Sequence, residues 1–454
     1  MVIIINSRQL VLDALKNKET QRTPWVPFVG CHAASLIGVT AEDFFKSKDN
    51  IVNGVCAAYE KYRPDGLPVL FDLQLEAEAM GCRLKYAPTN PPSVATHPLE
   101  DGKNLSEMSV PTLNDGRFPL VFEAAKEIQE KLGDKIALYG LITGPFTLAL
   151  HLMGTEIFYL MADEPGDVLA LMDFCERVCE FTAGMYIDAG IDIIALVDPM
   201  TSQISPQSFL TFVTPYATRV FEYIRRRGAL SSFFVCGDAT RNVENMCLCG
   251  PDNISIDENI PLDYVKEIGV KHGVSVGGNV KLTVTMLFGS PTDNINDAQN
   301  CMAIGGNRGY ILSPGCDMPF ATPHENVLAI SALIQGEVSD YMSSGSALDG
   351  VAYELPDYPN ERQVIVDVIT LDSASCAPCQ YMMEAVSQAC APYGEKVRYV
   401  EHKIKDKESV VCMIKLGVKN IPTIVIDGEI KYISIIPEVE VLKLDIQAAV
   451  DKKW

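Results

Sequence analysis

The chain has 454 residues, more than one hydrophobic core usually supports, so we expect two domains, the larger of a size that suits an α/β barrel. Hydrophobic residues make up 48% and charged residues 21%, which is typical of packed globular domains and argues against global disorder. The formal net charge of −22 opposes phosphate backbones and anionic membrane surfaces, so we expect neither nucleic acid nor a membrane as partner.

The amino-terminal segment carries no basic leader, no long apolar run and no small-residue cleavage site, so we infer no signal peptide and expect a cytoplasmic protein. In that compartment the 14 cysteines should be mostly reduced thiols. They are therefore available for burial, metal binding or redox chemistry.

Short runs of strand-forming residues alternate with helical stretches over the larger part of the chain. The runs are Trp25–Val29, Leu67–Phe71, Ile136–Tyr139, Ile191–Val197, Ser231–Val235, Asn253–Ile256, Val274–Val276 and Gly309–Leu312. Eight such runs, each followed by helix signals, predict an α/β fold, a closed (β/α)8 TIM barrel. One connecting helix is expected to begin at Ser205-Pro206 and to run to Arg227, before Gly228.

Near residue 345 the amino-acid composition changes to small, acidic and proline-containing stretches, which is typical of a linker. Strand-like and helical runs resume beyond it. We therefore predict a barrel over residues 1–343, a linker over 344–361 and a small α/β domain over 362–454.

Polar residues follow the predicted barrel strands, where a barrel carries out its chemistry. They are Cys31-His32, Asp72, Asp198, Cys236, Asp257, Asn279 and Cys316. Cys236 and Cys316 follow the fifth and eighth strands, so only closure of the barrel can bring them together. Two thiolates would be the start of a catalytic zinc site, which uses about three protein ligands, and the alternative is that both are buried fillers.

Several acidic residues are further candidates. Asp198 ends an almost wholly apolar strand, with Gln203 close behind, and a carboxylate there should have a partner or a catalytic task. Asp72 can be read as a catalytic residue or as a strand-end cap. Glu76 and Glu78 can be read as a solvated face or, for Glu78, as a functional carboxylate.

Five motifs give the region from about residue 1 to 340 a family resemblance. They are Phe28-Val29-Gly30-Cys31-His32-Ala33-Ala34, Glu76-Ala77-Glu78-Ala79-Met80-Gly81-Cys82, Ile142-Thr143-Gly144-Pro145-Phe146, Val235-Cys236-Gly237 and Leu312-Ser313-Pro314-Gly315-Cys316-Asp317. The region resembles the uroporphyrinogen decarboxylase superfamily, and within it the methylcobamide:thiol (coenzyme M type) methyltransferases.

That resemblance implies a zinc site formed by a His-x-Cys-Gly motif and a later cysteine. The cysteines match at Cys236 and Cys316, whereas Phe234 stands in the place of the histidine. Glu78, Asp198 and His32 are candidates for the missing ligand, and we choose Glu78. We expect catalytic roles for Asp198, Glu78, Gln203 and Asp72.

The activity implied is methyl transfer between a methylcobamide on a separate corrinoid protein and a small thiol or a methylated small molecule, with zinc activating the substrate. The direction of transfer is left open. One alternative is decarboxylation of uroporphyrinogen, although the arginine pair of that activity is missing from Trp25 to Ala34. Another is a non-catalytic, redox-regulatory barrel.

The carboxyl-terminal region contains Cys376-Ala377-Pro378-Cys379 between a strand and a helix, with Ile421-Pro422-Thr423 downstream. Over residues 362–454 it resembles a thioredoxin or glutaredoxin-like domain. This resemblance implies that Cys376 is the nucleophile, that Cys379 resolves, and that Pro422 is cis and lies beside their disulfide. A docking module without dithiol chemistry is the alternative.

Overall fold

The structure, a computed structural model, describes residues 6–337, 348, 350–374 and 376–454. The chain divides into two compact units, Met1–Ser344 and Gly345–Trp454. The amino-terminal residues 1–5, much of the expected linker and Ser375 lie outside the described residues. Among the described helices, none is both long enough and apolar enough to cross a membrane.

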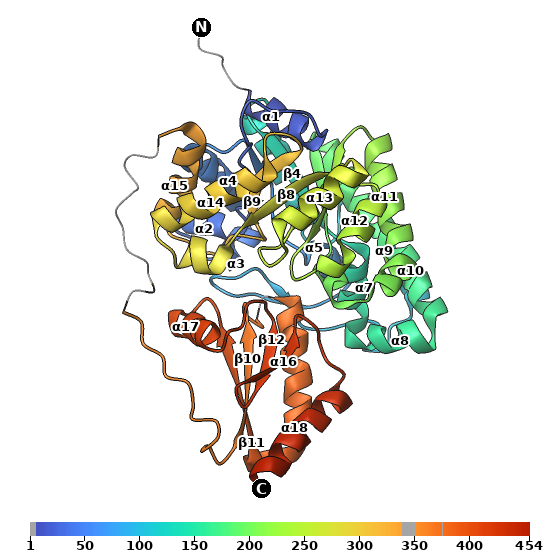
Figure 1. Ribbon diagram of the computed structural model, residues 1–454. Helices are drawn as coiled ribbons and strands as arrows, with labels where there is room; N and C mark the ends of the chain where they lie inside the picture. The colour runs from blue at the N-terminus through green and yellow to red at the C-terminus, as the bar shows by residue number, and fades with distance from the viewer. Residues whose placement is uncertain (1–5, 338–347, 349, 375) are drawn as a thin grey trace. The chain divides into compact units, whose positions relative to one another are not determined.

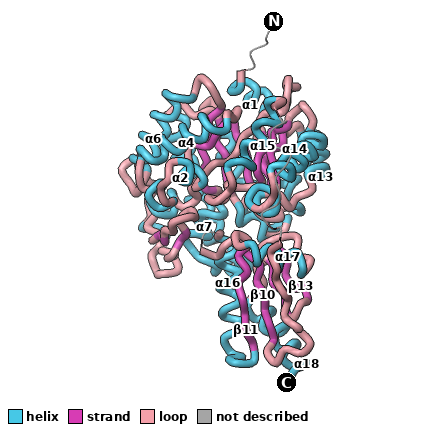
Figure 2. Tube along the Cα trace, turned by 90° about the vertical axis from the view of Figure 1, so that its left-hand side faces the viewer, coloured by secondary structure: helices cyan, strands magenta, loops and turns pink. Residues whose placement is uncertain are grey.

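Seven strands of the first unit form one parallel sheet in the order β1-β4-β5-β6-β7-β8-β9. Their bounds are β1 Gly66–Pro68, β4 Ala137–Thr143, β5 Ile193–Val197, β6 Leu230–Val235, β7 Asn253–Ile256, β8 Ser275–Val280 and β9 Tyr310–Pro314. Figures 1 and 2 show these strands inside a surrounding layer of helices. Because all the strands run in one direction, their carboxyl ends meet at a single mouth.

The eighth strand position is a short stretch around Trp25 that closes the sheet into a barrel. Trp25 forms a parallel bridge with Leu312 of β9, and Val26 N donates to Leu312 O at 2.9 Å. On the other side, Asp65 N donates to Trp25 O at 2.9 Å, next to β1. The predicted strand Trp25–Val29 is this short because the prolines on both sides, Pro24 and Pro27, have no N–H to donate to a neighbouring strand.

Fifteen described α-helices accompany the barrel strands. Their bounds are α1 Ser7–Leu15, α2 His32–Leu36, α3 Ala41–Phe45, α4 Lys48–Tyr62, α5 Leu75–Ala79, α6 Phe118–Leu132, α7 Pro145–Met153, α8 Ile157–Asp163, α9 Pro165–Asp188, α10 Pro206–Phe212, α11 Thr214–Arg226, α12 Val243–Leu248, α13 Leu262–His272, α14 Pro291–Gly305 and α15 His324–Gln335. A two-stranded sheet of β2 Leu84–Lys85 and β3 Ser93–Val94 lies between β1 and β4 in sequence and is separate from the barrel sheet.

The prediction of one helix over 205–227 is confirmed at the start of that helix. The prediction that the helix is continuous is wrong. Ser205 Oγ accepts a hydrogen bond from Ser208 N at 3.1 Å, as an N-cap should. The chain then breaks at Val213 between α10 and α11, because Pro215 in the first turn of α11 cannot donate the hydrogen bond that a continuous helix needs there.

The interior of the barrel is a packed apolar core. It contains residues of α1, of the barrel strands and of the stretches around Trp25 and Phe71. They are Val11, Ala14, Leu15, Val26, Phe28, Phe71, Ala137, Tyr139, Leu141, Ile193, Ala195, Val197, Phe234 and Ile311. Cys236 and Cys316 pack against this core at its edge. The two cysteines therefore lie where the apolar filling ends and the mouth begins.

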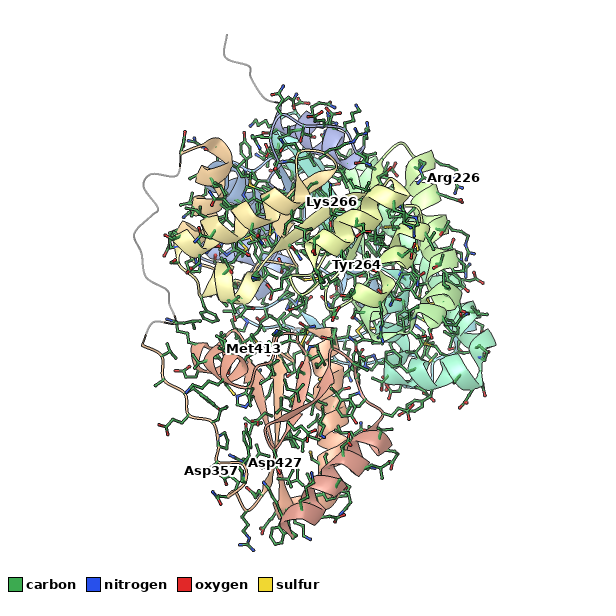
Figure 3. All side chains as sticks on the ribbon, viewed as in Figure 1. Arg226, Tyr264, Lys266, Asp357, Met413 and Asp427 are labelled. Atoms are coloured by element: carbon green, nitrogen blue, oxygen red, sulfur yellow. A yellow bond between two sulfur atoms is a disulfide. The ribbon has the colours of Figure 1, made fainter. Side chains whose placement is uncertain are left out.

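The second unit is a four-stranded mixed sheet with three α-helices. Its elements are β10 Val364–Thr370, α16 Ala377–Cys390, β11 Val397–Lys403, α17 Lys407–Lys415, β12 Thr423–Ile426, β13 Glu429–Ile433 and α18 Val439–Lys453, and the strand order is β11-β10-β12-β13. β11 is parallel to β10, whereas β12 is antiparallel to it. Asp427, labelled in Figure 3, lies in the turn after β12 and accepts hydrogen bonds from Ile365 N at 2.9 Å and Lys453 Nζ at 2.8 Å.

The two faces of this sheet have different partners. Val364, Val366 and Val368 alternate along β10 and belong to the core formed with α16 and α18. Asp367 points to the other face, where its Oδ1 lies 2.8 Å from His402 Nε2 and its Oδ2 accepts a hydrogen bond from Tyr358 Oη at 2.8 Å.

The described part of the expected linker packs on the second unit. Tyr358 reaches Asp367 as above, and the Tyr353 ring lies 6.0 Å from the His402 ring, centroid to centroid. Lys415 Nζ donates to Tyr353 O at 2.6 Å. The segment containing Asp357 (Figure 3) thus covers a buried polar cluster, because the aromatic residues in its acidic sequence supply contacts that a free linker lacks.

The His402–Asp367 pair gives the second unit a pH-dependent contribution to stability. Burial by itself would lower the pKa of His402, and the hydrogen bonds to Asp367 and Cys412 outweigh it and raise the pKa to about 9. Because the folded pKa lies above the ordinary value, the contribution is full below pH 6.5 and is lost as the pH rises through about 9, with an upper size of roughly 3 kcal/mol.

An NMR titration of the six histidines tests this expectation. One imidazole resonance should titrate near pH 9 and should be missing in His402→Gln. His32 and His151 should stay neutral down to low pH, because burial lowers their pKa values to about 4 and about 3. If no histidine titrates above pH 8, the ion pair with Asp367 does not form.

Candidate functional site

The two cysteines at the barrel mouth are bonded to each other. Cys236 follows β6 and Cys316 follows β9, and a disulfide joins their Sγ atoms across a Cα–Cα distance of 5.8 Å. Both side chains are partly exposed, whereas nine of the ten free cysteines are buried. The prediction that closure of the barrel brings Cys236 and Cys316 together agrees with this arrangement.

The loops that carry these cysteines rest on the end of β7. Gly237 N, next to Cys236, donates to Asp257 Oδ2 at 2.8 Å. Gly315, next to Cys316, packs so closely on the backbone at Glu258 that a Cβ atom there would overlap Glu258 N. Asp257-Glu258 therefore separates and supports the two cysteine loops.

Asp257 and Glu258 carry neighbouring carboxyl groups, and a cation lies near the Cys236 loop, since Arg241 Nη2 donates to Ser202 O at 2.9 Å. Burial raises the pKa of Asp257, and burial followed by the charge of Asp257 raises the pKa of Glu258 to about 8. Glu258 also accepts a hydrogen bond from Leu282 N. A group with such a pKa holds a proton at neutral pH and can exchange it with a neighbouring acid or base.

Phe234 fills the place where the family resemblance leads us to expect a histidine. Its side chain is fully buried in the barrel core. Its ring centroid lies 4.9 Å from that of Phe28 and 5.9 Å from that of Phe71. The space is thus occupied by an aromatic cluster that has no metal-binding atom.

Asp198 has a structural partner. Its carboxylate accepts hydrogen bonds from Thr147 N at 2.8 Å, Thr147 Oγ1 at 2.6 Å and Phe146 N at 3.2 Å, and so caps the start of α7. A Cβ atom at Gly144 would overlap this carboxyl group, so the glycine is required for the approach. Burial raises the pKa of Asp198 to about 6. These contacts give Asp198 the role of a positioning residue.

Asp72 and Glu78 share a buried cation that our sequence interpretation did not include. Arg117 Nη1 binds Asp72 Oδ2 and Arg117 Nε binds Glu78 Oε2, both at 2.6 Å. Burial alone would lower the pKa of Arg117, and the charges of Asp72 and Glu78 outweigh it and raise that pKa. The structure therefore pairs Glu78 with a guanidinium rather than with a metal.

Nothing local in the sequence identifies Arg117 as this partner. The two carboxylates at 72 and 78 indicate that some cation is needed, but Arg117 is far along the chain, at the start of α6. The interpretation of Glu76 as part of a solvated face is wrong, because its side chain is buried and accepts hydrogen bonds from Thr143 N and Oγ1 at 3.1 and 2.7 Å.

Like Glu78, Gln203 is partly exposed. Its Nε2 donates to Ser202 Oγ at 3.0 Å, and the same Ser202 Oγ would be 3.1 Å from a Cβ atom at Gly237. Gln203 is thus connected through one side chain to the Cys236 loop. His32 is occupied elsewhere, between Tyr62 Oη at 2.8 Å and Phe320 O at 3.1 Å.

The donor atoms at the mouth do not fit the expected zinc ion. Cys236 and Cys316 are bonded to each other, Phe234 offers no ligand, and Glu78 is bound to Arg117. Within the described part of the chain, no group of three or more His, Cys, Asp or Glu side chains is arranged to hold a metal. A catalytic zinc needs about three protein ligands, so we assign no step to it.

The second pair of cysteines lies at the start of α16. Cys376 is the N-cap residue and is partly exposed, Cys379 is buried in the first turn, and a disulfide joins them. The peptide bond between Ile421 and Pro422 is cis. The expected cis form of Pro422 and the expected pairing of Cys376 with Cys379 thus agree with the structure. The redox activity of this cysteine pair stays a prediction.

Arg117 provides a direct test of the buried ion pairs. Its replacement in Arg117→Gln leaves Asp72 and Glu78 without a cation, so we expect a loss of about 3–5 kcal/mol in the free energy of unfolding. Arg227→Gln is the matched control, because Arg227 is exposed and binds the exposed Asp188, so its loss should matter by less than about 1 kcal/mol. Chemical denaturation of the unaltered protein and the two variants measures both losses in the free energy of unfolding. Equal denaturation midpoints for the two variants would contradict the pairing of Arg117 with Asp72 and Glu78.

Phe234→His tests the fit of the mouth for zinc. Purified under a reducing agent that keeps Cys236 and Cys316 as thiols, the variant should hold close to one zinc per chain, because it supplies a third ligand. The unaltered chain should lose zinc to a mild chelator. Elemental analysis of both proteins decides, and a stoichiometric, chelator-resistant zinc in the unaltered chain would show that another ligand completes the site.

Comparison with known proteins agrees with this fold. A family model described as uroporphyrinogen decarboxylase (URO-D) matches residues 6–336. The chain is 27% identical over 266 residues to a methylcobamide:CoM methyltransferase of Methanosarcina acetivorans, covering 58% of this chain and 77% of the relative. It is 28% identical over 333 residues to a methylcobamide:CoM methyltransferase of Methanosarcina barkeri, covering 71% and 95%.

A solved structure of a methyltransferase from Methanosarcina mazei is also similar. It superimposes with a TM-score of 0.68 at 25% identity and covers 73% of this chain and 99% of that one. The family match extends over most of the chain and ends just after α15, so it corresponds to the barrel. The chain belongs to the uroporphyrinogen decarboxylase (URO-D) family.

Proposed function

We propose that the barrel is a corrinoid-dependent methyltransferase that moves a methyl group between a methylcobamide on a corrinoid protein and a small thiol, or another small methyl acceptor or donor. The observation that carries the proposal is the alignment with named methylcobamide:CoM methyltransferases over nearly the whole barrel. The mouth is the place for the reaction, because catalytic residues of barrels lie at the carboxyl ends of the strands.

The residues at the mouth divide into two groups by their contacts. Asp198, Asp72 and Glu78 are held by α7 and Arg117, so they position the surrounding loops. Gln203 and the Cys236–Cys316 pair are partly exposed and can meet a small molecule. We assign Gln203 to orientation of the substrate through its amide, and the surrounding apolar core to the exclusion of water.

The corrinoid supplies the transferable methyl group and its leaving-group chemistry. The acceptor reacts as a thiolate, which is the nucleophilic form of a thiol, and its sulfur–carbon bond forms as the methyl group leaves the carrier. The thiol proton passes to solvent, because Glu258, with its pKa raised to about 8, already holds a proton at neutral pH. The donor atoms at the mouth do not fit a zinc ion.

Decarboxylation of uroporphyrinogen is not favoured by the position of the nearest arginine. Arg22, which precedes the arginine-free stretch 25–34, binds Asp65 through Nη1–Oδ2 at 2.6 Å and Nη2–Oδ1 at 2.7 Å. This guanidinium is already matched by a carboxylate of its own chain. It cannot clamp a substrate carboxylate without losing that pair.

For the second unit we propose dithiol chemistry of the thioredoxin-like type. The cysteine pair at the start of the 14-residue helix α16 supports it, because a helix N-terminus lowers the pKa of a thiol and so favours the thiolate of Cys376. Cys379, one turn further and buried, is placed to resolve a mixed disulfide.

The methyl transfer proposal is tested by mixing the full chain with methylcob(III)alamin and a series of small thiols. We expect the visible spectrum of the cobalamin to change together with the appearance of a methylated thiol by mass spectrometry. Gln203→Ala should slow the reaction by about tenfold, the value of one hydrogen bond, whereas Gln207→Ala should not, because Gln207 is exposed on α10.

One combination of results would replace methyl transfer by decarboxylation as the proposed function. If no thiol is methylated by the reduced protein, and uroporphyrinogen is converted to coproporphyrinogen, the barrel is a decarboxylase. If methyl transfer is observed and Gln203→Ala and Gln207→Ala change its rate equally, Gln203 has no role in the site, and the proposed methyl transfer activity still holds.

A further inference from the structure

We propose that Cys236 and Cys316 form a reversible redox centre at the barrel mouth, and that the Cys376–Cys379 pair of the same protein is its thiol–disulfide exchange partner. This activity is separate from methyl transfer and does not depend on it. Four cysteines of the 14 are paired in the structure, and each compact unit holds one pair.

The first support is accessibility. Cys236, Cys316 and Cys376 are all partly exposed, whereas among the free cysteines only Cys56 is not buried. Thiol–disulfide exchange requires a thiolate that can reach a disulfide sulfur in line with its bond. Three of the four paired cysteines are thus partly exposed residues.

The second support is the chemistry around the barrel pair. Phe234 offers no metal ligand beside the two cysteines, and Asp257 Oδ2 accepts a hydrogen bond from the N–H of Gly237, next to Cys236. Without a metal to hold two thiolates, the neutral forms, a disulfide or two protonated thiols, avoid two like charges side by side. The pair is therefore suited to a two-electron cycle between these neutral forms.

The third support is the asymmetry between the two pairs. Cys376 lies at the N-terminus of α16, where the partial positive charge of the helix favours its thiolate, whereas Cys236 and Cys316 follow the strands β6 and β9. The attacking thiolate is accordingly Cys376, and the disulfide attacked is Cys236–Cys316.

The exchange balances without any other group. The Cys376 thiolate attacks Sγ of Cys236 or Cys316, the barrel disulfide breaks, and the sulfur released takes up the proton that Cys376 had given to water. Cys379 then attacks Sγ of Cys376, which frees the second barrel thiol and leaves a Cys376–Cys379 disulfide. Two electrons have passed to the barrel, and an external dithiol reductant returns the second unit to its reduced form.

The test measures how fast the barrel disulfide opens in the full-length protein. The oxidised chain is mixed with limiting dithiothreitol, samples are quenched with an alkylating agent, and labelled Cys236 and Cys316 peptides are quantified by mass spectrometry. We expect labelling at least about tenfold slower in Cys376→Ala/Cys379→Ala than in the unaltered chain, because the exchange partner is missing. Cys390→Ala, which removes a buried thiol of the same unit, is the matched control and should behave as the unaltered chain.

A trapping variant identifies the sulfur that is attacked. Cys379→Ala cannot resolve the mixed disulfide, so a peptide containing Cys376 should be found linked to one containing Cys236 or Cys316. A link within one chain and a link between two chains both support the exchange, and the mass of the intact product separates them. Equal labelling rates in the unaltered and double-variant chains would overturn the proposal, as would a Cys379→Ala protein whose Cys376 is linked only to the added reductant.

Discussion

The hydrogen bonds that join Trp25 and Val26 to β9 close the barrel, and the arrangement at its mouth depends on that closure. An open seven-stranded sheet would leave β9 and β1 as free edges and would set the ends of β6 and β9 apart. In the closed barrel the sheet curves back on itself, and Cys236 meets Cys316 with two strands between them in the sheet order. A short bridge flanked by prolines therefore decides whether the two sulfur atoms can react with each other.

The mouth is built largely from acidic groups that are satisfied by fixed partners. Asp198 caps a helix, Glu76 is bound by Thr143, and Asp72 and Glu78 share Arg117. Buried carboxylates are tolerated only with such hydrogen bonds or counter-charges. The groups left to meet a ligand are accordingly few, and the partly exposed cysteine pair and Gln203 are prominent among them.

Phe234 links the packing of the core to the chemistry of the mouth. Its ring completes a cluster with Phe28 and Phe71 that seals the top of the apolar interior. The same position can hold either this ring or an imidazole directed at a metal, but not both. Aromatic packing here therefore leaves the two cysteines free to bond to each other, and sulfur redox chemistry becomes available where a metal site would otherwise be expected.

The sequence by itself determined the class of fold, since eight short apolar runs that alternate with helical stretches are typical of a parallel sheet covered by helices. It also predicts a division near residue 345 and names the two cysteine pairs as candidates. The tertiary structure alone decided the partners: Arg117 for Asp72 and Glu78, the start of α7 for Asp198, and Cys316 for Cys236. The physical reason is that local sequence patterns report the burial and direction of a side chain, whereas charges and sulfur atoms interact with whatever the closed fold brings within a few ångströms, at any distance along the chain.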